Sequence, residues 1–183
     1  MRCQPILGAL VLATSVFIGL TVARAGTEVA GYGSNSDIAF AERLWSALKR
    51  DRLVGSSRRI VSAQRGKRPH GSVQQVAKGE LNVAGRNGRV LVKANHRGTK
   101  LTTAKVMRYP NKYLSGYAVM FRRESGYDPA NQDWFWVVFE RNGSVRKFRK
   151  KAIAGRVDTG TTNGCIGCHR KEGGRDLETL TKN

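Results

Sequence analysis

The stretch Trp134-Phe135-Trp136-Val137-Val138-Phe139 consists only of aromatic and β-branched residues, which favour β-strands. Side chains alternate between the two faces of a strand, so this one presents apolar side chains on both. Such a strand belongs inside a sheet that is covered on both sides. We therefore expect residues 134–139 to form a central strand of the fold.

Further strands are expected on both sides of this one. Asn142-Gly143 is typical of a tight hairpin turn and predicts a following strand over Val145–Phe148. Upstream, apolar β-prone runs cover Tyr117–Phe121 and Val90–Lys93, the latter after a turn at Gly85–Gly88. Residues Val73–Val83 mix helical and alternating patterns, and we interpret them as a helix.

A helix is expected near the start of the chain. Apolar residues recur at helical spacing from Ile38 to Leu48, with Trp45 as a core anchor, and Ser36 or Asp37 can cap the first turn. The helix should run to about Leu53. The fold class is therefore α+β: a mainly antiparallel β-sheet with an N-terminal helix and a C-terminal segment, which carries the cysteine motif described below.

The first 25 residues are typical of an export signal. Arg2 precedes an apolar run from Ile6 to Val22, and Ala23-Arg24-Ala25 resembles a cleavage site. A membrane anchor is the alternative, but the run is short for a span and contains Thr14 and Ser15. We expect a signal peptide over 1–25, a flexible leader over 26–35, one domain over 36–183, a periplasmic location and no stable membrane anchor.

The chain is strongly basic, with 33 Lys and Arg against 13 Asp and Glu. Removal of Arg2 and Arg24 leaves 33 − 2 = 31 basic residues, and 31 − 13 gives a net charge of +18. An exported protein meets no nucleic acid in its ordinary compartment, so we expect none as a partner. A solvated basic surface, an acidic redox partner protein and anionic lipid remain as explanations.

Cys165-Ile166-Gly167-Cys168-His169 is the motif that carries chemistry. Its spacing is that of covalent haem attachment, in which two thiols on one turn bond one edge of the porphyrin and the histidine binds the iron. Two alternatives are a redox disulfide and half of a zinc site. The disulfide motif normally opens a helix in a βαβ unit, and only His70 and His96 could complete the zinc ligands. We therefore predict one covalently bound haem c.

Three motifs resemble the cytochrome P-460 family. They are Gly126-Tyr127-Asp128-Pro129, then Asp133-Trp134-Phe135-Trp136, then the C-terminal haem motif, with His70-Gly71 and Val90–Lys93 fitting the pattern upstream. The resemblance implies a mainly antiparallel α+β domain, usually a homodimer, with histidine-ligated haem and an open sixth position. Some members oxidise hydroxylamine, and the related β-type cytochromes c′ bind nitric oxide without oxidising hydroxylamine.

Lys93 matches a lysine that is bonded to the porphyrin in the hydroxylamine-oxidising members. Alternation places Lys93 on the same strand face as Leu91, opposite Val90 and Val92, from where it could reach a cofactor edge. The resemblance thus assigns Lys93 to catalysis and cofactor binding. The alternative is a lysine at a strand end that extends into water.

Those members also carry a distal carboxylate on the strand before the Gly-Tyr-Asp-Pro turn, and this chain has none there. Tyr117, Ala118 and Met120 occupy that region, while Glu124 lies beyond the strand. An apolar or phenolic pocket favours a neutral diatomic ligand over proton-coupled oxidation.

The sequence leaves two functions open. The first is an exported cytochrome P-460-like protein whose open iron acts on a small nitrogen compound, by hydroxylamine oxidation or nitric oxide binding. The second is an electron carrier in which Met107 or Met120 closes the iron, although methionine more often packs in a core. His70 and His96 are further possible ligands of the iron, but they follow polar or basic neighbours, so we expect both to be exposed.

Overall fold

The computed structural model describes residues 31–158, 164–172 and 175–178. The expected signal peptide and residues 26–30 of the leader lie outside this part of the chain. The elements in order are α1 (Asn35–Arg50), β1 (Ala63–Arg65), β2 (Val73–Val83), β3 (Arg86–His96), α2 (Thr103–Arg108), β4 (Leu114–Arg122), η1 (Pro129–Asn131), β5 (Trp134–Phe139), β6 (Lys147–Phe148), β7 (Lys151–Ala152), β8 (Ala154–Gly155), α3 (Cys165–Glu172) and η2 (Arg175–Leu177). The N-terminal helix and the mainly antiparallel sheet confirm the predicted α+β class.

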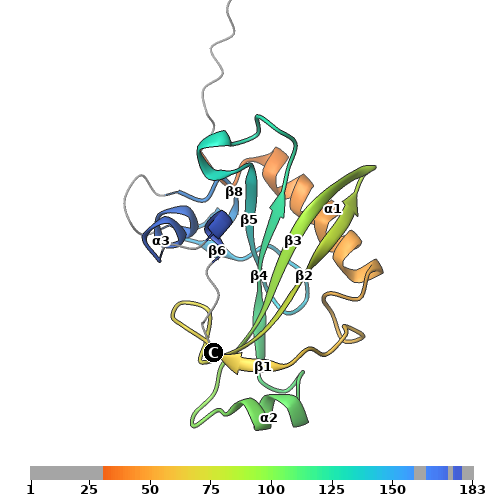
Figure 1. Cartoon of the computed structure of the whole chain (residues 1–183), viewed down its shortest axis with the longest axis vertical. Helices are drawn as coiled ribbons and strands as arrows, with labels where there is room; N and C mark the ends of the chain where they lie inside the picture. Colours follow the sequence, from red (N-terminus) through yellow and green to blue (C-terminus); the bar gives the residue numbers. More distant parts are fainter. Residues whose placement is uncertain (1–30, 159–163, 173–174, 179–183) are drawn as a thin grey trace, which may run out of the picture.

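Six strands form one twisted sheet in the order β1-β2-β3-β4-β5-β8 (Figure 1). Every neighbouring pair is antiparallel. β6 and β7 pair separately as a small hairpin. Figure 1 shows α1 and α3 on opposite sides of the sheet. The sheet therefore has two faces to bury.

β5 has the boundaries that the sequence predicts, and both of its faces are buried. Phe135, Val137 and Phe139 belong to the apolar core beneath α1. Trp134 and Trp136 belong to a second cluster on the opposite face. Burying an aromatic side chain contributes about 1.5–3 kcal/mol, so this strand stabilises both layers at once.

α1 covers the first face. Its first turn is closed by a capping box in which Asp37 N–H donates to Ser34 Oγ at 3.1 Å and Ser34 N–H donates to the Asp37 carboxylate at 3.1 Å. The cap is thus Ser34 rather than the expected Ser36 or Asp37. Trp45 packs on the core as predicted, its ring 5.0 Å from that of Phe139. Before the cap, Gly33 N–H donates to Ala154 O at 2.7 Å, which joins the end of the leader to the sheet.

The helix predicted over Val73–Val83 is wrong, because this segment is strand β2. It pairs with β3 along its whole length, from Val73 opposite His96 to Val83 opposite Arg86. The two-residue turn between them has positive φ at Ala84 and Gly85, as tight hairpins require. The periodicity of this segment fits both a helix and a strand, and pairing with β3 makes it a strand.

The turn after β5 forms where Asn142-Gly143 predicts it, with Glu140 N–H donating to Ser144 O at 2.8 Å. The strand expected over Val145–Phe148 is shorter than predicted. Val145 makes a single bridge to Phe139, and Lys147–Phe148 pairs with β7 instead of β5.

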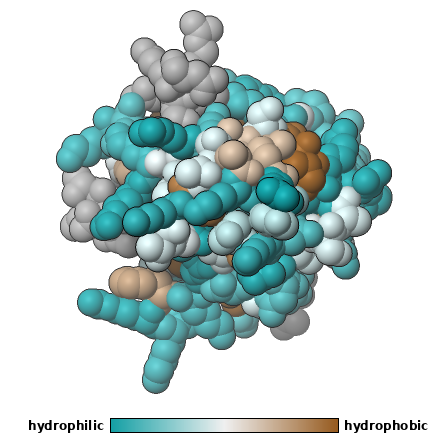
Figure 2. Space-filling view, turned by 90° about the horizontal axis from the view of Figure 1, so that it is seen from below, coloured by the Kyte–Doolittle hydropathy of each residue, from teal (hydrophilic) through white to brown (hydrophobic). Residues whose placement is uncertain are grey.

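The surface is largely hydrophilic. Figure 2 shows one face on which hydrophilic residues surround a limited apolar area. Within the described ranges, no helix is both long enough and apolar enough to cross a membrane.

Gly143 provides a test of the packing between the turn and α1. It has φ +95°, and a Cβ added there would overlap the Trp45 indole, whereas Gly85 has φ +85° with open space around it. Both Gly→Ala changes should cost about 1–2 kcal/mol for the left-handed backbone. We expect Gly143→Ala to cost about 1–3 kcal/mol more from overpacking, measured by denaturant unfolding. Equal losses in the two variants would contradict the packing described here.

Candidate functional site

A cavity of about 790 Å³ lies on the sheet face opposite α1. This volume is within the roughly 300–1,000 Å³ typical of cofactor and ligand sites. The sequence-predicted site residues all line it: Lys93 from β3, and Cys165, Cys168 and His169 from α3. Segments that are distant in the chain therefore meet in one place.

α3 is held against the sheet by its second residue. Ile166 is 1% exposed and packs in the second cluster with Leu91, Met120, Trp134 and Trp136. Its N–H donates to Val157 O at 3.2 Å. Residues three and four apart share one helix face, so anchoring Ile166 turns Cys165, Cys168 and His169 toward the cavity together.

The two cysteines are partly buried and are not bonded to each other. Burial raises the pKa of the Cys165 thiol to about 12. Redox-active cysteines instead have lowered pKa values, because the thiolate is the reactive form. The motif does open a helix, but the described strands pair only antiparallel, so it does not lie in a βαβ unit. In the raised pKa of Cys165 and in the antiparallel sheet around it, the motif differs from a redox disulfide of the usual kind.

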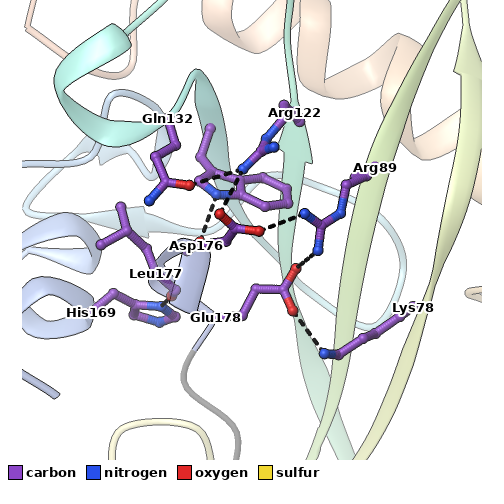
Figure 3. A network of polar contacts seen from close by, with 9 residues as sticks. Lys78, Arg89, Arg122, Gln132, His169, Asp176, Leu177 and Glu178 are labelled. Atoms are coloured by element: carbon purple, nitrogen blue, oxygen red, sulfur yellow. Dashed lines mark hydrogen bonds and ion pairs between the residues drawn. The ribbon is translucent and has the colours of Figure 1, made fainter. Parts of the chain in front are cut away.

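His169 is 4% exposed and fixed from two sides. Its Nδ1 lies 2.6 Å from Leu177 O, a bond drawn in Figure 3, and its ring lies 4.7 Å from that of Trp136 in an edge-on arrangement. A carbonyl only accepts, so Nδ1 carries the proton and Nε2 keeps its lone pair. Burial lowers the pKa of His169 to about 4, although the Leu177 bond opposes this shift. The ring is a neutral imidazole, the form that binds metals.

Lys93 is 4% exposed, and alternation along β3 places it as predicted. Leu91 and Lys93 line the cavity, while Val90 and Val92 belong to the core beneath α1. The pKa of Lys93 is lowered to about 8, and burial is the largest cause of this shift. At pH 7 roughly a tenth of the molecules then carry Lys93 as the neutral, nucleophilic amine, far more than for an ordinary lysine.

The wall beside Lys93 is apolar. Ala118 lies opposite Lys93 in the β3–β4 register, Met120 lies opposite Leu91, and both line the cavity. Tyr117 faces the other side of the sheet, where its hydroxyl accepts from Gly55 N–H at 3.0 Å. The expectation that Tyr117 lines the pocket is therefore wrong, because alternation places residue 117 on the opposite face from residue 118, although another phenol, that of Tyr32, does line the cavity.

The carboxylate expected in hydroxylamine-oxidising members has no counterpart among the described residues that line the cavity. Glu124 lies beyond β4, where its carboxylate accepts from Arg123 at 2.8 and 2.9 Å. These bonds lower its pKa, so it stays ionised at the surface.

The methionines and histidines divide between inside and outside the site. Met120 lines the cavity, whereas Met107 is 44% exposed on α2 and does not. His70 lines the cavity, its ring 6.0 Å from that of His169, and burial lowers its pKa to about 3. The expectation that His70 and His96 are exposed is wrong. β3 extends to His96, which is fully buried against Gln75.

Two cavity features were missed by sequence reasoning. Trp136 contributes an indole whose Nε1 is buried with no hydrogen-bond partner, and its position two residues from Trp134 was the available signal. No sequence signal could have identified the Leu177 carbonyl, because every residue has a backbone carbonyl and its orientation depends on the fold.

Within residues 31–158, 164–172 and 175–178, no three His, Cys, Asp or Glu side chains form a group that could hold a metal ion. The zinc site considered from the sequence would need four such ligands. Haem makes a smaller demand, because the porphyrin nitrogens supply four of the iron ligands and one histidine suffices from the protein. The donor set of this cavity fits haem better than a bare ion.

The chain was compared with protein-family models, curated proteins and solved structures. No protein-family model, curated protein or solved structure matches the chain. The resemblance to cytochrome P-460 therefore rests on the motifs quoted above.

The buried His96 predicts a dependence of stability on pH. Burial lowers its pKa from 6.5 to about 4, so the unfolded chain binds a proton that the folded chain refuses between those values. His96 alone should contribute up to about 3 kcal/mol to the fall in unfolding free energy as pH drops from about 6.5 to 4, and the lowered pKa values of His70 and His169 add to this fall. In His96→Gln the unfolding free energy should fall less over this window than in the wild type. Above pH 7 the two proteins should show the same dependence of unfolding free energy on pH. Identical slopes from pH 7 to 4 would contradict this assignment.

Proposed function

We propose that the chain is an exported mono-haem c-type cytochrome of the cytochrome P-460 kind, with an open haem iron that acts on a small nitrogen compound. One observation carries the proposal: the Cys-x-x-Cys-His motif and the buried Lys93 line one cavity of cofactor size. Cys165 and Cys168 would hold the haem through thioethers, and His169 would bind its iron. Haem would supply a redox-active iron with one position for a ligand.

His169 is prepared for this role. Its Nδ1–H is bound to Leu177 O, so Nε2 is the nitrogen available to iron. Trp136 packs against the imidazole and restricts its rotation. Nδ1 retains its proton while Nε2 serves as the ligand.

The part of the cavity wall that β4 contributes opposite Lys93 and Leu91 suits a neutral ligand. Ala118 and Met120 provide no charge and exclude water from their part of the wall. The lining described above contains no carboxylate that could accept protons from hydroxylamine. Nitric oxide binding therefore has more support than hydroxylamine oxidation, which would require another proton acceptor and an acceptor cytochrome for the electrons.

A second function has support from Met120, which is 4% exposed and lines the cavity. If its sulfur bound the iron opposite His169, the protein would be an electron carrier without catalysis. Met107 lacks this support, since it does not line the cavity.

Charge suggests the partner. Arg97, Arg146 and Arg149 line the cavity on a chain of formal charge +20. An acidic redox partner protein would be attracted to this surface. Homodimer formation belongs to the same proposal and rests on the family resemblance.

Visible spectra separate the two functions. We expect ferrous protein from an exporting host to be high-spin and to change its spectrum on adding nitric oxide. A low-spin, six-coordinate spectrum that ignores nitric oxide would support the electron carrier instead. Incubation with hydroxylamine and an electron acceptor then tests turnover, and consumption of hydroxylamine would show that the missing carboxylate is not required.

Lys93 has a separate test. If its amine is bonded to the porphyrin, protease digestion should yield a haem peptide that contains both Lys93 and Cys165–His169, and Lys93→Met should move the ferrous band to shorter wavelength. Lys147→Met, at an exposed strand position, is the control and should leave the spectrum unchanged. A haem peptide without Lys93, with no spectral change in Lys93→Met, would leave Lys93 as a buried cavity lysine only.

A further inference from the structure

The C-terminal turn that contacts His169 has a strained backbone. Asp176 has φ 58° and Leu177 has φ 58°, and neither residue is glycine. Side chains disfavour this left-handed region, so two such residues in succession persist only where their surroundings hold them. The strained pair presents the Leu177 carbonyl to His169 Nδ1 at 2.6 Å. Something outside the turn must therefore stabilise it.

Ion pairs on both sides of Leu177 provide that stabilisation. Arg89 Nη1 lies 2.7 Å from the Asp176 carboxylate, and Arg89 Nη2 lies 2.6 Å from that of Glu178. Lys78 Nζ lies 2.7 Å from the other Glu178 oxygen, and Arg122 Nη2 lies 3.6 Å from Asp176. Figure 3 shows these side chains reaching from the sheet to the turn.

The backbone of the turn is fixed as well. Trp134 Nε1 donates to Asp176 O at 2.8 Å, one peptide before the carbonyl that binds His169. The Glu178 side chain is 9% exposed, so its two pairs are shielded from water on one side. Isolated surface ion pairs contribute little, but a network with shared partners and a forked arginine restricts geometry.

We propose that Arg89, together with Lys78 and Arg122, forms an ion-pair clamp that positions the axial histidine by holding the Leu177 carbonyl on His169 Nδ1. The proposal rests on the proposed haem function. The clamp residues do not touch the cofactor cavity, so they are positioning residues. A firm bond at Nδ1 makes the imidazole a stronger electron donor to iron and fixes its ring plane. The clamp thereby links a surface charge network to the reduction potential of the site.

The structure offers a matched control on the same strand. Arg86 makes one exposed ion pair, with Glu124 at 3.5 Å, and does not contact the C-terminal turn. Arg89→Met and Arg86→Met remove the same atoms from β3, but only the first releases the turn. Arg89→Lys is a second variant that keeps the charge and loses the fork that spans two carboxylates.

The test uses the full chain purified from an exporting host. In Arg89→Met we expect the iron–histidine stretching frequency to fall and the midpoint potential to rise, because a weakened Nδ1 bond makes His169 a poorer donor. Arg86→Met should match the wild type, and Arg89→Lys should lie between. Thermal unfolding identifies variants that fail to fold, in which case Arg89→Lys decides the result. If Arg89→Met and Arg89→Lys match Arg86→Met in both readouts, the network is structural only and the proposal is overturned.

A readout that needs no haem keeps this proposal separate from the proposed function. Nitrogen NMR of the His169 ring reports which nitrogen carries the proton. If the purified chain contains no haem, the haem function fails, but the clamp still predicts a single Nδ1–H form in the wild type and a mixture in Arg89→Met. An unchanged single form in Arg89→Met would overturn the clamp with or without haem.

Discussion

Burial of both faces of β5 is the constraint on which the rest of the structure depends. Its phenylalanines require cover from one side and its tryptophans from the other. α1 supplies a full helix for the first face. On the second face, among the described residues, the short helix α3 packs through Ile166, with Val157 and Leu177 beside it and a large cavity next to them. In the proposed holo-protein, the flat apolar porphyrin would complete this second layer, so the cofactor would be part of the fold as well as its reactive centre.

Local sequence patterns predicted the features that neighbouring residues determine, such as the position of a strand and the face on which a side chain lies. Alternation located β5 and placed Lys93 on the cavity face, and the cysteine motif selected the residues that meet it there, although the helix that carries them was not predicted. Features that depend on a partner strand or on burial were not predictable. β2 was read as a helix because its own periodicity is mixed, and its hydrogen bonds are made to β3 rather than within the segment. Buried His96 was read as exposed because its polar neighbours conceal the length of β3.

The proposed site combines a neutral imidazole with an ion-pair network behind it. His169 is held neutral by burial, and the residue opposite Lys93 in β4 is the apolar Ala118. Acidic residues are scarce in this chain, yet Asp176 and Glu178 both flank the carbonyl that binds His169. These two carboxylates lie behind His169, outside the cavity lining, where their ion pairs can orient the ring.

The most direct test of the central claim is the mass of the protein purified from an exporting host under denaturing conditions, with the attached group mapped by peptide. The account predicts the mass of residues 26–183 plus one haem, retained on the peptide that contains Cys165 and Cys168. A mass without haem, and a disulfide between these two cysteines, would contradict it.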